Sequence, residues 1–239
     1  TKTMRLGPLC YLLPLYSPLR LVEEIGMLDH LSHGRLDLGV GRGVSPFELN
    51  YHKVDPDSSR EVFMEALDVV LNGMTHDHLT HEGKHFSYKD VPMELRPLQD
   101  PHPPIWYPSS TPETARLAGQ RGYNYSTLGP LAKAKAAIDG YREGYAERGG
   151  TPAGPALDFP GGTAISVNRH VVVAETDEKA LEIANPAYVA WHKSLTKLWR
   201  ENNVQGPSFA GSVLTDATDS VSSGAFIVGS PATVREQVE

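Results

Sequence analysis

The sequence predicts an α/β fold, in which short strands alternate with helices along the chain. Two observations favour this class. Short apolar runs recur, and most of them are followed by a segment whose apolar residues have helical spacing. Proline and hydroxyl residues stand where helices should begin, and glycines stand where they should end. The 239 residues are 40% hydrophobic, which is enough for one large domain with a full core.

The first unit is strand, helix, strand. The apolar run Arg5–Leu13 is bounded by Pro14 and predicts a buried strand. A helix should begin at Pro18 and continue through Leu31, because proline is favoured at the first helical position. The turn Ser32–Gly34 then leads into a second strand, so the two strands form a parallel crossover.

The second strand lies in Arg35–Gly43, RLDLGVGRG, which alternates charged and apolar residues before a run of small ones. This pattern is typical of a buried strand whose carboxyl end approaches another group closely. Arg42 is the only charge at that end, and its guanidinium suits a phosphate. The glycine spacing does not match the G-x-G-x-x-G fingerprint of dinucleotide sites.

The middle of the chain is less regular. We predict a polar loop over Ser45–Ser58 and a helix over Ser59–Asn72 that Gly73 ends. The segment His76–Pro104 is rich in histidine, proline and glycine, and should contain at most a hairpin, around Leu79–Tyr88.

Further strands and helices alternate to the end of the chain. The predicted strands are Ile105–Tyr107, Tyr123–Leu128, Val167–Ala174 and Ala225–Val228; the predicted helices are Pro112–Gln120, Leu131–Arg148, Asp177–Asn202 with a break near Asn185-Pro186, and one from Pro231. About six strand–helix units fit an open doubly wound sheet or a barrel, whose complete form has eight strands. We predict a single domain over residues 1–239 with loop insertions near 74–104 and 205–223.

Composition excludes several classes of partner. The formal charge of −7 argues against a nucleic-acid or anionic-membrane surface. The single cysteine, Cys10, cannot form an internal disulfide and fits a reducing compartment. The sequence has no run of about 20 apolar residues and no signal-peptide pattern. These features predict a soluble, cytoplasmic protein.

Three stretches resemble the bacterial luciferase-like flavin-dependent monooxygenases: LPLYSPLRLVEEIGMLDHLSHGRLDLGVGRG, PPIWYPSSTPETARLAGQRG and VAETDEKALEIANPAYVAWHKSLTKLWREN. The resemblance covers Arg5–Val238 and implies a TIM (β/α)8 barrel, usually dimeric, that uses reduced FMN and oxygen. Arg5–Leu13 is similar to the third barrel strand of the family. The resemblance therefore implies an incomplete barrel without the first two β/α units, and a homodimer in the full-length form.

The resemblance also implies a phosphate site. Arg42 and the backbone N–H of Val44 match one part of it, and the hydroxyls of Ser110, Thr111 and Thr114 match the other. Each residue has an ordinary structural alternative. Arg42 could satisfy a turn, and Thr111 could cap the helix that follows, although a helix N-terminus also favours an anion. Glu113 counts against an anion there, because it already complements the helix dipole.

Leu9 and Cys10 match the strand that passes under the isoalloxazine ring in the family, so we expect backbone contact with the flavin. Cys10 itself should behave as a small buried apolar residue. Gly41 stands where some luciferases carry a cysteine. The acid–base histidine of the family follows its second strand, and the resemblance implies that this part is not in the sequence. We therefore name no catalytic residue.

Four histidines, His76, His78, His81 and His85, raise the question of a metal site. They lie in a predicted hairpin without fixed ligand spacing, among other charged residues. A solvated loop is the favoured interpretation, and we predict no metal site.

These features together predict an oxidoreductase of the luciferase-like class, acting with reduced FMN and oxygen on a small organic substrate. A separate reductase should supply the reduced flavin, because the sequence has no nicotinamide fingerprint. The same motifs fit a deazaflavin-dependent dehydrogenase. A non-catalytic barrel subunit of a luciferase-like heterodimer is the alternative from another class. Gln205–Ser223 is predicted to be a lid over the cavity.

Overall fold

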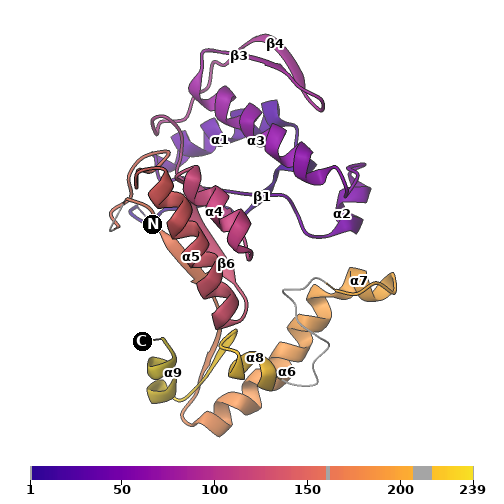
Figure 1. Cartoon of the computed structure of the whole chain (residues 1–239), viewed down its shortest axis with the longest axis vertical. Helices are drawn as coiled ribbons and strands as arrows, with labels where there is room; N and C mark the ends of the chain where they lie inside the picture. The colour runs from indigo at the N-terminus through magenta and orange to yellow at the C-terminus, as the bar shows by residue number, and fades with distance from the viewer. Residues whose placement is uncertain (1, 160–161, 207–216, 239) are drawn as a thin grey trace. The chain divides into compact units, whose positions relative to one another are not determined.

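The computed structural model describes residues 2–159, 162–206 and 217–238 and confirms the α/β class (Figure 1). The chain divides into two compact units. Unit 1 comprises Thr1–Pro108, Ala115–Tyr125 and Tyr141–Ile165; unit 2 comprises Ser109–Thr114, Ser126–Gly140 and Ser166–Glu239. Several elements cross this division, so the units share strands and helices. No helix among the described residues is long and apolar enough to cross a membrane.

The main sheet has five strands in the order β1-β2-β5-β6-β7. They are β1 Tyr11–Leu12, β2 Leu38–Gly41, β5 Ile105–Pro108, β6 Asn124–Leu128 and β7 Ile165–Asn168. β2 pairs in parallel with β1 on one side and with β5 on the other. The predicted crossover is therefore confirmed. The first strand is shorter than predicted. Leu6 forms an isolated parallel bridge with Leu36, and regular pairing with β2 starts only at Tyr11.

Two helices carry much of the core of unit 1. α1, Pro18–Ser32, packs against α3, Ser59–Thr75 (Figure 1). The prediction that Gly73 ends α3 is wrong, since the helix continues to Thr75. A Cβ atom on Gly73 would lie 2.9 Å from Cγ2 of Val22 on α1. Gly73 therefore allows the two helices to approach closely.

The predicted polar loop before α3 contains a short helix, α2 Pro46–Tyr51. The Oγ atom of Ser45 accepts a hydrogen bond from the backbone N–H of Glu48 at 3.3 Å. Pro46 occupies the first helical position, so the local sequence forms an ordinary helix start. A single 3-10 turn, η1 Leu13–Leu15, follows β1.

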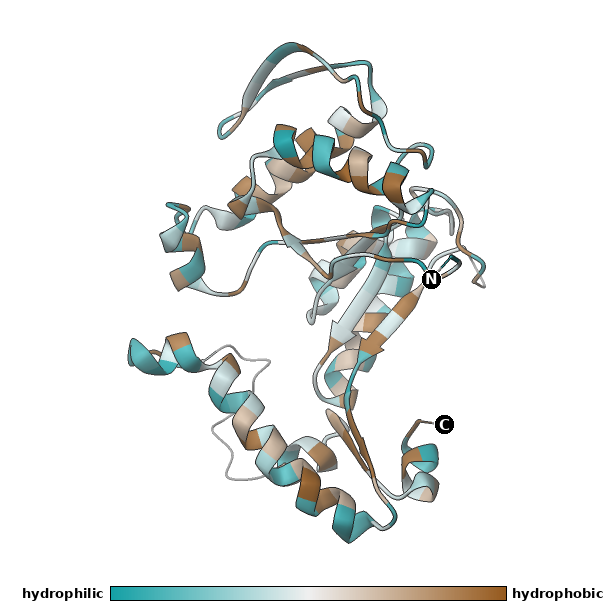
Figure 2. Ribbon diagram, turned by 180° about the vertical axis from the view of Figure 1, so that it is seen from behind, coloured by the Kyte–Doolittle hydropathy of each residue, from teal (hydrophilic) through white to brown (hydrophobic). Residues whose placement is uncertain are grey.

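The predicted hairpin is confirmed and is longer than expected. Its antiparallel strands are β3 His78–Glu82 and β4 Ser87–Pro92, which are mostly hydrophilic (Figure 2). The carboxylate of Glu65 on α3 accepts hydrogen bonds from the backbone N–H groups of Phe86, at 2.8 Å, and His85, at 3.0 Å. These bonds fix the hairpin turn to α3.

The predicted strand Val167–Ala174 is divided at Arg169. Its first part is β7 of the main sheet, and its second part is β8 His170–Val173. β8 pairs in parallel with β9 Phe226–Gly229 in a separate two-stranded sheet, so the last predicted strand does not join the main sheet. Figure 2 shows both strands as strongly hydrophobic. The helix α6 packs on this pair, with Ala180, Ala184, Tyr188, Phe226 and Val228 in a shared core.

The helix α6 covers Asp177–Leu195 and continues through Pro186, so the predicted break there is wrong. The side chain of Pro186 is exposed, and neighbouring Asn185 accepts a hydrogen bond from Ala217 N–H at 3.1 Å. The break comes instead at Thr196, before α7 Lys197–Glu201.

The other helices are α4 Pro112–Gln120, α5 Leu131–Glu147, α8 Thr218–Ser222 and α9 Pro231–Val238. α4 has the predicted bounds, and α5 ends one residue before its predicted end. The helix α8 falls inside the predicted loop Gln205–Ser223. Residues 207–216 of the predicted lid lie outside the described residues.

Candidate functional site

The start of α4 is held by hydroxyl groups. The backbone N–H of Thr114 donates to Oγ1 of Thr111 at 3.4 Å, so Thr111 caps the helix as expected. The Thr111 hydroxyl donates in turn to the Thr114 hydroxyl at 3.0 Å, and the Thr111 N–H donates to Oγ of Ser109 at 3.3 Å. Free N–H groups and the helix dipole make such a terminus favourable for an anion. Glu113, in the same turn, opposes this.

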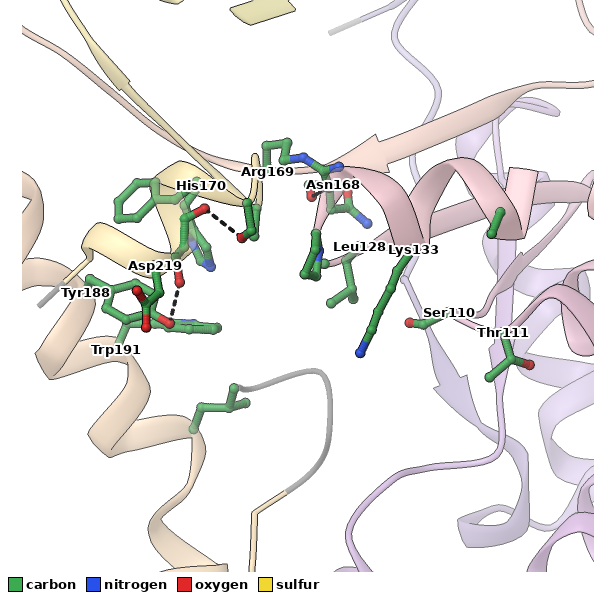
Figure 3. A pocket seen from close by; sticks show the side chains of 18 of the residues that line it. Ser110, Thr111, Leu128, Lys133, Asn168, Arg169, His170, Tyr188, Trp191 and Asp219 are labelled. Atoms are coloured by element: carbon green, nitrogen blue, oxygen red, sulfur yellow. Dashed lines mark hydrogen bonds between the residues drawn. The ribbon is translucent and has the colours of Figure 1, made fainter. Parts of the chain in front are cut away.

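This helix start opens into a cavity of about 720 Å³ that lies wholly within unit 2. The cavity has two chemically different ends (Figure 3). Ser110, Thr111 and Lys133 form a hydroxyl and ammonium end, and His170, Tyr188 and Trp191 form an aromatic end. Phe226 belongs to the aromatic end, because its ring contacts those of His170 and Tyr188. Its size is in the usual range for pockets that bind small molecules.

The rings of the aromatic end contact one another. The centroids of His170 and Trp191 are 4.4 Å apart with an interplanar angle of 64°, and those of His170 and Phe226 are 5.5 Å apart at 67°. Tyr188 lies 5.5 Å from Trp191 and 5.7 Å from Phe226, centroid to centroid. Tyr188 and Phe226 are buried, so they hold the less buried Trp191 and His170 at the cavity wall.

Polar groups lie beside these rings. The hydroxyl of Ser220 on α8 donates to the Tyr188 hydroxyl at 2.7 Å (Figure 3). Burial lowers the pKa of His170, so its imidazole is neutral at pH 7. Burial also lowers the pKa of Arg169, which remains charged and donates to the carbonyl of Asn168 at 2.9 Å. Apart from Ser110, Thr111 and Glu113 near the start of α4, none of the cavity residues named here was singled out from the sequence, because they come from separate segments.

Arg42 lies in unit 1. Its side chain is exposed, and Nη1 donates to the hydroxyl of Ser59 at 3.1 Å. Ser59 begins α3, so Arg42 lies at the start of that helix. Burial raises the pKa of Tyr107, and the guanidinium groups of Arg60 and Arg42 are among those that oppose the rise. A second cation, Arg60, therefore accompanies Arg42. Arg60 was not singled out from the sequence, although it directly follows the predicted helix start.

The two parts of the predicted phosphate site belong to different units, Arg42 to unit 1 and Ser110, Thr111 and Thr114 to unit 2. Their joint action stays a prediction, as does the role of the Val44 N–H. The side chain of Val44 is 56% exposed.

The glycines of β2 allow the preceding segment to pass closely. A Cβ atom on Gly41 would lie 2.4 Å from Sγ of Cys10, and one on Gly39 would lie 2.2 Å from the carbonyl oxygen of Pro8. Burial raises the pKa of the Cys10 thiol to about 11, so it is a neutral thiol at pH 7. Leu9 is half exposed. Flavin contact by Leu9, Cys10 and Gly41 stays a prediction.

The four histidines pair separately. His76 Nδ1 lies 3.1 Å from the carbonyl of Asn72, and His78 pairs with Asp90 at 2.9 Å. His81 pairs with Glu65 at 3.2 Å and His85 with Glu61 at 3.4 Å; across the described part of the chain, no group of three or more His, Cys, Asp or Glu could hold a metal ion.

Comparisons with known proteins agree on the family of this chain. The family model for luciferase-like monooxygenases matches residues 1–239. The uncharacterised protein y4wF of Sinorhizobium fredii is 41% identical over 192 residues, which are 80% of this chain and 54% of that protein. The oxygenase component of the flavin-dependent trigonelline monooxygenase of Acinetobacter baylyi is 29% identical over 207 residues, 81% of this chain and 54% of that protein. The chain thus spans about half the length of these curated relatives.

Two solved structures share the fold. Monooxygenase RslO1 from Streptomyces bottropensis has a TM-score of 0.76 and 25% identity, over 100% of this chain and 67% of that one. The oxygenating constituent of 3,6-diketocamphane monooxygenase from Pseudomonas putida, solved with FMN, has a TM-score of 0.72 and 24% identity, over 100% of this chain and 70% of that one. The fold is therefore of the luciferase-like TIM-barrel type, and the chain belongs to the luciferase-like monooxygenase family.

Proposed function

We propose that this chain carries the flavin-binding face of an oxygenase that uses reduced FMN and molecular oxygen on a small organic substrate. The observation that carries the proposal is the hydroxyl-capped start of α4, which opens directly into a 720 Å³ cavity. An anionic group at the helix start would leave the rest of the cavity free for an organic molecule.

The donor set fits FMN. Its phosphate needs hydrogen-bond donors and positive charge, which Ser110, Thr111 and Lys133 offer at one end of the cavity. Arg42 of unit 1, whose side chain is exposed, remains a predicted phosphate residue. The Glu113 carboxylate must turn toward solvent, which its exposed position permits.

Reduced flavin supplies two electrons, so that one oxygen atom enters the substrate and the other leaves as water. The residues of this chain bind, orient and exclude water. Leu128, Trp191 and Phe226 supply apolar cavity wall, and Asn168 is oriented by the hydrogen bond that it donates to Ser126 at 3.0 Å. The name of the trigonelline relative, an oxygenase component, supports a separate reductase as partner.

A deazaflavin is the second candidate cofactor. Two structures that share this fold are described as coenzyme F420-dependent enzymes, a tetrahydromethanopterin reductase from Methanopyrus kandleri and a secondary alcohol dehydrogenase. A deazaflavin also carries an anionic side chain, so the same helix start could hold it. A non-catalytic subunit is the less favoured alternative, because the hydroxyls and Arg42 of the predicted flavin site are all present.

Anaerobic titration of the protein with reduced FMN, riboflavin and F420 tests the proposal. We expect saturable binding of reduced FMN that is tighter than that of riboflavin, followed by oxidation of the bound flavin when oxygen is admitted. Preferential binding of F420 would establish the deazaflavin candidate instead. Failure of all three ligands to bind would contradict a cofactor-binding role for this chain.

A further inference from the structure

We propose that the aromatic end of the cavity binds the planar ring of a neutral aromatic substrate that carries a hydroxyl group. Trp191 supplies the contact surface, and His170 is the hydrogen-bond partner of the hydroxyl (Figure 3). This inference rests on the proposed function, because it names the substrate class of the same site.

The shape of the wall favours a flat ring. Aromatic rings prefer edge-to-face or offset contacts with centroids about 4.5–7 Å apart. The ring contacts of His170, Trp191, Tyr188 and Phe226 follow this pattern. Tyr188 and Phe226 are buried beneath, whereas Trp191 keeps part of its ring accessible, so an incoming ring can extend the same array.

The charge of the cavity favours a neutral ligand. Its charged lining residues are Glu113, Lys133, Arg169 and Asp219, two of each sign. In the proposal, the phosphate of the cofactor is placed at the end that holds Lys133. Asp219 lies at the aromatic end, so an anionic ring substituent would be repelled there (Figure 3).

The imidazole of His170 at the aromatic end favours a hydroxyl group on the ligand. A neutral imidazole has one donor and one acceptor, and its tautomer decides which of the two faces the cavity. A hydroxyl group can both donate and accept, so it pairs with His170 in either tautomer. The neighbouring Tyr188 hydroxyl already accepts a hydrogen bond from Ser220.

Equilibrium binding of two probes without flavin tests the inference. 2-Naphthol has a flat ring and a hydroxyl, whereas 2-methylnaphthalene has the same ring with a methyl group. We expect Trp191→Leu to weaken both probes about three- to tenfold, because both lose the aromatic contact. We expect His170→Phe to weaken only 2-naphthol, about three- to tenfold, because it keeps a ring and removes the hydrogen bond.

Leu181→Ala is the matched control, since Leu181 is on α6, is 37% exposed and does not line the cavity. It should change neither affinity. Equal effects of His170→Phe on both probes, or no effect of Trp191→Leu on either, would overturn the inference.

Titration of the same variants with reduced FMN separates this inference from the proposed function. We expect both variants to keep FMN affinity within about twofold of the unmodified protein. Loss of FMN affinity together with naphthol affinity would place the flavin ring at the aromatic end and overturn the substrate assignment. Absence of FMN binding to every form, with the probe results as expected, would contradict only the proposed cofactor.

Discussion

Replacement of Gly41 by alanine tests the packing between β2 and the segment before β1. The new Cβ atom would lie 2.4 Å from Sγ of Cys10, whereas the next atom, Cδ2 of Leu12, is at an ordinary 3.6 Å. Contacts between apolar atoms are favourable at about 3.5–4.0 Å, so the sulfur or the strand must move. Overpacking of this kind costs about 1–3 kcal/mol, and we expect Gly41→Ala to lower the free energy of unfolding by that amount.

The clash depends on one sulfur atom, so it can be removed. We expect Cys10→Ala alone to cost about 1 kcal/mol. In that background, Gly41→Ala should cost less than about 0.5 kcal/mol, because the Cβ atom of residue 10 would be 3.8 Å away. Urea unfolding of the unmodified protein, the two single variants and the double variant measures this coupling when all four have the same m-value. An equal cost of Gly41→Ala in both backgrounds would refute the steric explanation.

Three further predictions concern titratable groups. Burial raises the pKa of Cys10 to about 11, so at pH 8 the fraction of thiolate should be about a hundredfold lower than for a thiol of pKa 9.0. Iodoacetamide should therefore alkylate Cys10 correspondingly slowly until the pH exceeds about 10. The buried carboxylate of Asp29 accepts hydrogen bonds from N–H and Nε2 of Gln99 at 2.9 and 2.8 Å, so Asp29→Ala should cost about 2–4 kcal/mol in urea unfolding, and a cost below 1 kcal/mol would contradict this. The backbone N–H of Ser230 donates to the Asp177 carboxylate and lowers its pKa. This hydrogen bond should therefore stabilise α9 above pH 3.8 and weaken as the pH falls further. Amide exchange of α9 should show this pH dependence, and Asp177→Asn should remove it.

Local signals made much of the fold predictable. The start of α4 follows from Pro112 at its first position and from the cap at Thr111, which are signals within four residues. The same kind of signal was present for α2, since Ser45 and Glu48 have the spacing of a helix start. The polar composition of that segment suggested a loop, although its first turn is well capped.

Features that depend on distant residues were not predictable. Nothing local divides Val167–Ala174 at Arg169; the division arises because β8 pairs with β9, which is more than fifty residues later in the chain. Pro186 predicts a helix break, but α6 continues through it because the helix packs on the sheet of β8 and β9. The aromatic end of the cavity combines β8, α6 and β9 for the same reason, so no motif marks it.

The central claim is that the hydroxyl-capped start of α4 holds the flavin phosphate, and the affinities for reduced FMN and riboflavin test it most directly. Riboflavin lacks the phosphate. We expect Thr111→Val to weaken FMN about 10- to 100-fold and riboflavin less than about twofold. The same comparison with Arg42→Ala tests the separate prediction for Arg42. Thr111→Ser keeps the hydroxyl and should retain FMN affinity. Equal losses for FMN and riboflavin in Thr111→Val would contradict the claim.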